Sequence, residues 1–121
     1  MALRALIIDD NGHFLGAARD LLEREGVEVV AVGSTGAEAV QLAAELRPDV
    51  TLVDIDLGEE SGFDVARMLM QDDTHGNLST VVLISTHAEK DFADLIASSP
   101  AVGFVAKSDL SARTLHEVLD R

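Results

Sequence analysis

Short runs of apolar residues recur along the chain at regular intervals. Many of these residues are β-branched, and both alternating sets of positions within each run are apolar. A strand with two apolar faces is typical of a parallel sheet that helices cover on both sides. We therefore predict five buried strands, at residues 3–9, 27–33, 49–54, 79–86 and 101–106.

The segments between these runs carry apolar residues at helical spacing. Residues 14–22 place apolar side chains at i, i+3, i+4, i+7 and i+8, which forms one stripe along a helix. Similar stripes predict four further helices, around residues 37–44, 63–70, 92–96 and 115–119. Gly26 and Pro48 favour the ends of the first two helices, the third should end near Gln71, and Ser111 suits the N-cap of the last.

Strands that alternate with helices over short connections imply right-handed crossovers between parallel strands. The predicted fold class is therefore α/β: a doubly wound, three-layer sandwich with a five-stranded parallel sheet and five helices. The pattern uses the whole chain, residues 1–121, and no repeat, low-complexity segment or linker interrupts it. We expect one domain.

Charge narrows the possible functions. The 121 residues include 22 acids and 9 bases, which gives a formal net charge of −13. Nucleic-acid phosphates and anionic lipids repel such a chain, so we expect no direct nucleic-acid binding by this chain and no membrane association. No apolar run approaches the roughly 20 residues that span a bilayer. The chain has no cysteine, which excludes thiol chemistry and fits a cytoplasmic location.

Candidate chemistry lies just beyond the predicted strands, because ligands of open parallel sheets bind at the carboxyl ends of the strands. The second strand ends in Gly33 and Ser34, as an edge strand away from a site would. The other strand ends carry Asp9 and Asp10, Asp54 and Asp56, Ser85 and Thr86, and Lys107. Singly, each residue is typical of a loop, a helix cap or a surface position. Together they predict one polar site at one edge of the sheet.

Three of these carboxylates, those of Asp9, Asp10 and Asp54, would lie near one point and repel each other, and a divalent cation would remove the repulsion. Oxygen ligands with positions left open for water suit Mg²⁺. A lysine can neutralise the remaining charge and pair with an incoming anion, while a hydroxyl can hydrogen-bond the same anion. The set therefore predicts a phosphoryl-acceptor site in which an aspartate carboxylate is the nucleophile.

Four collinear motifs resemble those of one family: LIIDDN at 6–11, DVTLVDIDL at 49–57, VVLIST at 81–86 and GFVAK at 103–107. The chain resembles a receiver domain of the bacterial two-component response regulators, of the chemotaxis-regulator type, over essentially all of residues 1–121. The resemblance implies a flavodoxin-like fold with strand order 2-1-3-4-5. It also implies a cytoplasmic phosphoprotein that works in phosphorelay signal transduction through a 4-aspartylphosphate.

The resemblance implies a role for each matched residue. Asp54 would take the phosphoryl group, Lys107 would contact it, and Ser85 would hold the switch-hydroxyl position. A new dianionic group on Asp54 should draw the Ser85 hydroxyl toward it. Phe104, the implied switch aromatic, would then swing inward to fill the space behind the fourth strand.

The implied cofactor is Mg²⁺. In the family's arrangement Asp10 would bind the ion directly, and Asp9 would hold it mainly through water. Asp54 and the main-chain carbonyl of Asp56 would complete the protein ligands. Because few protein groups are dedicated to the ion, we expect weak binding that depends more on Asp10 and Asp54 than on Asp9.

The implied partners are proteins. A sensor histidine kinase or a phosphotransfer protein would donate the phosphoryl group. We expect the fourth helix, fifth strand and fifth helix to form the face that changes on phosphorylation. A partner, or a second copy in a homodimer, would dock there.

Three positions depart from the family pattern without removing a chemical group from the site. Gly58 stands where proline is frequent, which could loosen the loop after Asp54. Ser108 also replaces a frequent proline, and Thr86 fills a position that is usually small. We expect these departures to affect kinetics and conformational detail, including the lifetime of the phosphoryl group.

Two alternatives stay open at the level of sequence. The segment DIDLG resembles the nucleophile motif of haloacid-dehalogenase-like phosphatases, but in that family this motif comes first, whereas here Asp9 and Asp10 precede it. A degenerate receiver that serves as a binding platform is the second alternative, and the intact acids, hydroxyl and lysine argue against it. We expect phosphorylation and dephosphorylation of the chain itself, and no turnover of a separate substrate.

Overall fold

The computed structural model describes residues 2–71, 80–86 and 92–120. The parallel sheet consists of β1 (Arg4–Ile8), β2 (Glu28–Gly33), β3 (Val50–Asp54), β6 (Val81–Ser85) and β7 (Gly103–Ala106). These strands lie in the order β2-β1-β3-β6-β7, which is the predicted order 2-1-3-4-5. The α/β prediction is confirmed. The strands β6 and β7 begin two residues later than predicted, and Ser79 lies outside the described residues.

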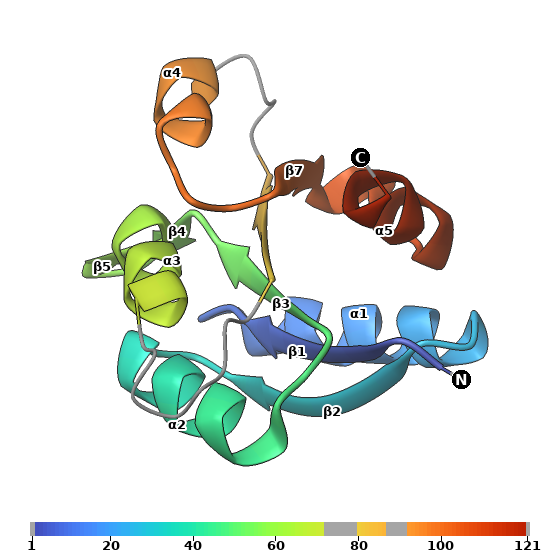
Figure 1. Ribbon diagram of the computed structural model, residues 1–121. Coiled ribbons are helices and arrows are strands. Elements are labelled where there is room, and N and C mark those ends of the chain that lie inside the picture. Colours follow the sequence, from blue (N-terminus) through green and yellow to red (C-terminus); the bar gives the residue numbers. More distant parts are fainter. Residues whose placement is uncertain (1, 72–79, 87–91, 121) are drawn as a thin grey trace.

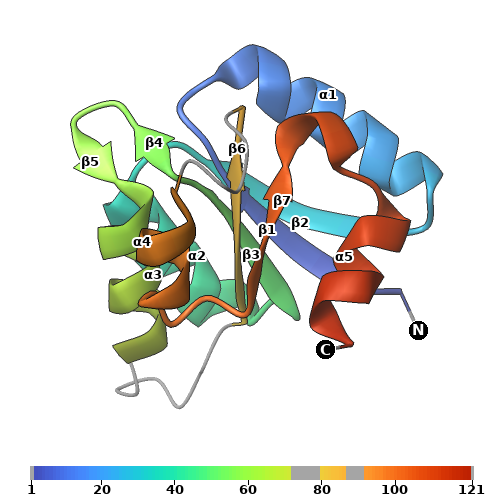
Figure 2. The ribbon, with the colours of Figure 1, turned by 90° about the horizontal axis from the view of Figure 1, so that it is seen from above.

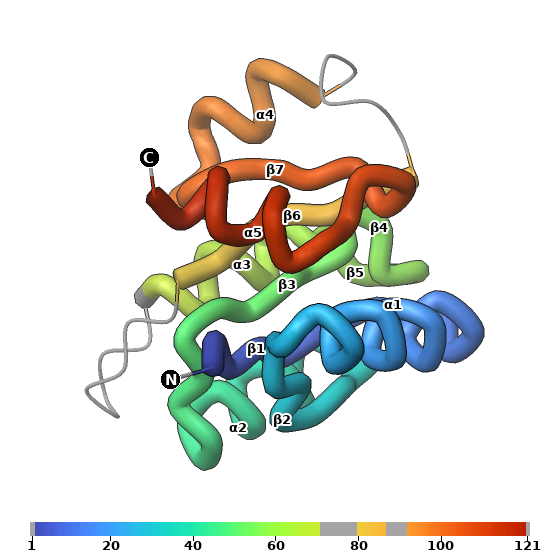
Figure 3. Tube along the Cα trace, turned by 90° about the vertical axis from the view of Figure 1, so that its right-hand side faces the viewer, coloured from blue at the N-terminus to red at the C-terminus, as the bar shows by residue number. Residues whose placement is uncertain are grey.

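Helices cover both faces of the sheet (Figure 1). One layer consists of α1 (Gly12–Arg24) and α5 (Ala112–Leu119), and the other of α2 (Gly36–Leu46), α3 (Gly62–Gln71) and α4 (Ala93–Ala97). Figure 2 shows the strands between these two layers, and Figure 3 shows α1 and α5 across one side of the sheet. The three-layer sandwich is therefore as predicted. No helix among the described residues is long and apolar enough to cross a bilayer.

The alternation of side chains in the strands explains why both sheet faces are apolar. In β1, Ala5 and Ile7 pack in a cluster with residues of α1 and α5. Leu6 and Ile8 pack in a second cluster with residues of α2 and α3. All four side chains are fully buried. Each face of the strand thus contributes to a separate core, as expected of a parallel sheet.

Side-chain caps fix the helix ends near the sheet edge. The Asn11 side chain accepts hydrogen bonds from the His13 and Phe14 amides and so begins α1 directly after the acidic pair. The predicted N-cap Ser111 is confirmed, because its side chain accepts a hydrogen bond from the Thr114 amide at the start of α5. The helix α3 reaches Gln71, where the described residues stop.

A small antiparallel hairpin, which the sequence analysis did not predict, follows β3. It pairs β4 (Asp56–Leu57) with β5 (Glu60–Ser61). Gly58 adopts a φ of +71° in the connecting turn. Proline is fixed near −65° and could not adopt this backbone conformation, whereas glycine adopts it without strain. The hairpin therefore gives a physical reason for glycine at a position where the family often has proline.

Candidate functional site

The parallel strands bring the candidate side chains to one edge of the sheet. Asp9 directly follows β1, and Lys107 directly follows β7. Asp54 and Ser85 are the last residues of β3 and β6. A cavity of about 220 Å³ at this edge is lined by Asp10, Asn11, Asp54, Asp56, Gly58, Ser85, Thr86 and Lys107. The polar groups expected from four strand ends thus meet at one place.

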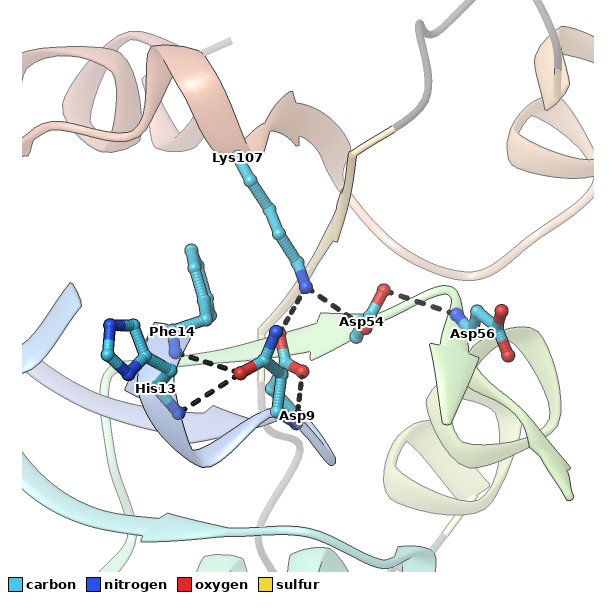
Figure 4. Close-up of polar contacts among 7 residues, drawn as sticks. Asp9, His13, Phe14, Asp54, Asp56 and Lys107 are labelled. Atoms are coloured by element: carbon cyan, nitrogen blue, oxygen red, sulfur yellow. Dashed lines mark hydrogen bonds and ion pairs between the residues drawn. The ribbon is translucent and has the colours of Figure 1, made fainter. Parts of the chain in front are cut away.

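Lys107 joins two buried carboxylates (Figure 4). Its Nζ atom lies 2.6 Å from Asp9 Oδ2 and 3.2 Å from Asp54 Oδ2. Asp9 is fully buried and Asp54 is 6% exposed. The ammonium group therefore compensates the negative charges of two carboxylates, one fully buried and one at the wall of the cavity.

Main-chain amides fix the other oxygen of each carboxylate. Asp9 Oδ1 accepts a hydrogen bond from the Asn11 amide at 2.9 Å. In the same way, Asp54 Oδ1 accepts one from the Asp56 amide at 3.2 Å. In both residues the main-chain amide two positions later binds Oδ1, and Oδ2 points toward Lys107. The two carboxylates are thus oriented by the loops that follow their strands.

Burial and neighbouring charges shift the pKa values of Asp54 and Lys107. Burial raises the pKa of Asp54 to about 6 from 3.8; the Asp56 amide opposes the shift, the Asp9 charge adds to it, and Lys107 opposes it. Burial lowers the pKa of Lys107, but the hydrogen bonds and charges of Asp9 and Asp54 outweigh burial, so the pKa is raised. Lys107 therefore remains charged at neutral pH.

Three acids of the site lie close enough together to bind one cation. Asp9, Asp10 and Asp54 each offer a carboxylate oxygen, and these oxygens lie within 4.8 Å of one another. Asp9 Oδ2 is paired with the Lys107 ammonium, and no other partner of this atom is recorded among the described residues. Asp10, in contrast, is exposed. An oxygen-only set with one member open to water fits Mg²⁺, which keeps several waters when it binds.

The remaining predicted residues occupy distinct positions. Asp56 has an exposed side chain at the start of β4, and Thr86 is exposed at the cavity edge. Ser108 is exposed in a short 3₁₀ helix, η2 (Lys107–Asp109). Phe104 does not line the cavity. It is half-buried and packs against the core cluster on the α2 and α3 face of the sheet.

Phe14 is a site residue that sequence reasoning missed. Lys107 Nζ lies 4.4 Å from the centroid of its ring, in the geometry of a cation–π contact. The periodicity of residues 14–22 assigns Phe14 only to the apolar stripe of the first helix. Its place in the first turn of α1, just after the acidic pair, was the available signal, but the contact joins residues 14 and 107 and depends on the tertiary fold.

Asp54 should make the stability of the metal-free chain depend on pH. Because its folded pKa of about 6 lies above the ordinary 3.8, protonated Asp54 stabilises the fold below about pH 3.8, and this stability is lost as pH rises through about 6. Asp54→Asn should therefore be more stable than the wild-type chain at about pH 8, by about 1 kcal/mol after allowance for solvent screening. Urea unfolding without Mg²⁺ measures the difference, which should shrink toward zero at about pH 4. A difference that does not change with pH would contradict the prediction.

Comparison with known proteins identifies the family. Residues 5–120 match the response regulator receiver domain. The chain is 33% identical over 107 residues to the polar-differentiation response regulator DivK of Brucella anthropi, covering 88% of this chain and 85% of DivK. It is 31% identical over 109 residues to a protein-glutamate methylesterase/protein-glutamine glutaminase of Archaeoglobus fulgidus, covering 88% of this chain and 30% of that protein.

A longer relative and a solved structure are also similar to this chain. The chain spans 18% of the length of a second methylesterase relative, from Alkalilimnicola ehrlichii, with 40% identity over 72 residues, or 59% of this chain. The crystal structure of a LuxR-family two-component response regulator from Aurantimonas sp. SI85-9A1 superposes with a TM-score of 0.80 at 25% identity, covering 100% of this chain and 88% of that one. This chain belongs to the receiver domain family of the two-component response regulators.

Proposed function

We propose that this receiver domain, residues 1–121, accepts a phosphoryl group on Asp54 from the phosphohistidine of a sensor histidine kinase or a phosphotransfer protein. The observation that carries the proposal is the setting of Asp54. It ends β3, lines the cavity and shares the Lys107 ammonium with Asp9. Asp56, the other acid of the motif, has an exposed side chain and no contact with Lys107 among those recorded for the described residues.

The proposed reaction is a displacement at phosphorus. A carboxylate oxygen of Asp54 attacks the phosphorus atom of the donor, and an oxygen–phosphorus bond forms while the nitrogen–phosphorus bond breaks. The electron pair leaves with the donor imidazole, which takes up a proton. The Lys107 ammonium lies 3.2 Å from Asp54 Oδ2, where it can balance the charge of the transferred oxygens.

Asp10, Asp9, Asp54 and the main-chain carbonyl of Asp56 are the groups that we propose hold Mg²⁺. When bound, the ion supplies positive charge that screens the carboxylates from the incoming phosphoryl oxygens. The mutual proximity of the three carboxylates supports this assignment. Asp9 is also paired with Lys107, which supports a weaker, mainly water-mediated role for it than for exposed Asp10.

Removal of Mg²⁺ should stop phosphorylation. Without the ion, Asp54 faces the charge of Asp9 and of the donor with Lys107 as the compensating cation. Incubation with acetyl phosphate and Mg²⁺ should add the mass of one phosphoryl group in intact-protein mass spectrometry. Replacing Mg²⁺ by a chelator should lower the rate by at least about 100-fold. Equal modification with and without the ion, or none with any phosphodonor, would refute the proposal.

The output that we propose is a change on the face formed by α4, β7 and α5. Ser85 is buried at the cavity, and Phe104 lies on the neighbouring strand β7. Leu95 on α4 and Val102 just before β7 are 53% and 46% exposed, which supports docking of an apolar partner surface or a second copy there. The phosphoryl group would bias this face through Ser85 and Phe104.

The partners in this proposal are proteins. The net charge of −13 opposes direct binding of this chain to nucleic acid. We also propose a cytoplasmic location, because the proposed phosphohistidine donor is of the two-component type. Output through DNA would then require another domain or another protein.

A further inference from the structure

The short β4–β5 hairpin directly follows the strand that ends in Asp54. It begins at Asp56, two residues after Asp54, and its pairs are Asp56 with Ser61 and Leu57 with Glu60. Each strand has two residues, and an isolated hairpin is marginally stable at best. The hairpin therefore needs contacts with the rest of the fold if it is to hold a main-chain group in place.

One such contact lies at the base of the hairpin. The Gly62 amide donates a hydrogen bond to the Ile55 carbonyl at 2.7 Å. A Cβ atom on Gly62 would lie 2.0 Å from the Asp54 carbonyl oxygen, so the chain passes too close for any larger residue. This contact closes the hairpin where it leaves the sheet, but it does not tie the turn to another element.

Glu60 provides a contact between the hairpin and α2. Its Oε1 accepts a hydrogen bond from the Gly36 amide at 2.9 Å, across 24 positions of sequence. Gly36 is the first residue of α2, where amides have no partner within the helix and the helix dipole favours a carboxylate. A Cβ atom on Gly36 would lie 2.6 Å from Glu60 Oε2, so the carboxylate sits directly against the main chain.

Other hydrogen bonds at this end of α2 do not involve Glu60. Thr35 caps the helix by accepting a hydrogen bond from the Glu38 amide. The Glu38 carboxylate in turn accepts hydrogen bonds from the amide and hydroxyl of Ser34. Loss of Glu60 should therefore leave α2 intact while it releases the hairpin.

We propose that Glu60 is a positioning residue, which anchors the β4–β5 hairpin to α2 and so holds the Asp56 main-chain carbonyl in the geometry for Mg²⁺. This inference rests on the proposed function, in which that carbonyl is a ligand of the ion. Glu60 acts through the hairpin and touches neither the ion nor the phosphoryl group. Supporting groups of this kind typically contribute 10- to 100-fold to metal affinity.

Glu59 offers a matched control. It is the preceding residue of the same hairpin, carries the same charge and is exposed. No hydrogen bond or ion pair of Glu59 is recorded among the described residues. Removal of either acid lowers the negative charge near the site by one unit. A difference between Glu60→Ala and Glu59→Ala therefore reports the anchor and not the charge.

The test uses NMR to measure the Mg²⁺ affinity, the chemical shift of the Gly36 amide and the rate at which this amide exchanges with solvent. Four variants are compared: Glu60→Ala, Glu60→Gln, Glu59→Ala and Glu59→Gln. We expect Glu60→Ala to bind Mg²⁺ about tenfold more weakly than Glu59→Ala. Its Gly36 amide should shift and exchange faster with solvent, already in the absence of the ion. Glu60→Gln keeps an acceptor oxygen and should stay within about threefold of Glu59→Gln.

The outcomes separate this inference from the function on which it rests. Equal Mg²⁺ affinities for Glu60→Ala and Glu59→Ala, with normal binding by the wild-type chain, would overturn the anchoring role alone. A Gly36 amide whose chemical shift and exchange rate in Glu60→Ala equal those of the wild-type chain would also overturn the anchoring role. A wild-type chain that binds no Mg²⁺ would overturn the proposed metal site and this inference together.

Discussion

Replacing Asp54 by asparagine should abolish phosphorylation. The amide keeps the shape of the side chain but lacks a nucleophilic carboxylate oxygen, and loss of a nucleophile typically costs at least about 1,000-fold in rate. The intact mass of Asp54→Asn should stay unchanged after incubation with acetyl phosphate and Mg²⁺. The wild-type chain under the same conditions should gain the mass of one phosphoryl group, which mild base should remove.

Asp56→Asn is the control for this prediction. It makes the same chemical change two residues away, on a side chain that is exposed, while the main-chain amide that donates to Asp54 remains. We expect its phosphorylation rate to stay within about threefold of the wild-type rate, because only a surface charge is lost. Full loss of phosphorylation in Asp56→Asn together with its persistence in Asp54→Asn would reverse our assignment of the acceptor.

Replacing Lys107 by methionine should damage both the fold and the reaction. The change removes the cation that pairs with Asp9 and Asp54 and leaves two buried carboxylates without compensation. Breaking a buried ion pair in this way should lower the free energy of unfolding by about 3 kcal/mol in the absence of Mg²⁺. The rate of phosphorylation should fall by about 100-fold, since a charge that stabilises the transferred group is lost.

Urea unfolding and the rate of mass gain measure these two effects. Arg113→Met is the matched control, because it also removes one cation, but from an exposed side chain paired with Glu117 at the surface. Its stability should change by less than about 0.5 kcal/mol. The double variant Asp9→Asn/Lys107→Met also lacks one of the two uncompensated carboxylates. It should therefore recover part of the stability that Lys107→Met loses. A Lys107→Met chain as stable and as reactive as Arg113→Met would contradict our account of the site.

The sequence predicted the sheet and, with it, the edge at which the polar strand ends meet. Both alternating sets of side chains in β1 are apolar, and this pattern led directly to a parallel sheet with helices on both faces. Once the strands are parallel, their carboxyl ends must meet at one edge. The approach of Asp9, Asp54 and Lys107 to one another could therefore be anticipated from local patterns.

The contacts that refine the site could not be predicted in this way. The Phe14 ring reaches Lys107, and the Glu60 carboxylate reaches Gly36, through the packing of elements that are distant in sequence. Periodicity assigns a residue to a face of a helix or strand but does not say which distant group it meets. The hairpin after β3 was missed for a related reason, since two-residue strands leave no alternation to detect.

The phosphatase alternative receives no support from the comparisons. The match to the receiver domain runs from residue 5 to residue 120, through all four motifs in order. The alternative of a binding platform without phosphorylation is addressed by the chemistry of the site. A platform would not require a shared lysine between two buried carboxylates, one of which lines an open cavity.

Direct location of the phosphoryl group tests the central claim. Reduction of the phosphorylated chain with borohydride converts an aspartyl phosphate to homoserine, and peptide mass spectrometry then identifies the modified position. Our account predicts homoserine at position 54 and at none of the neighbouring acids Asp9, Asp10 and Asp56. Homoserine at one of those positions, or a phosphoryl group on a histidine or serine, would contradict it.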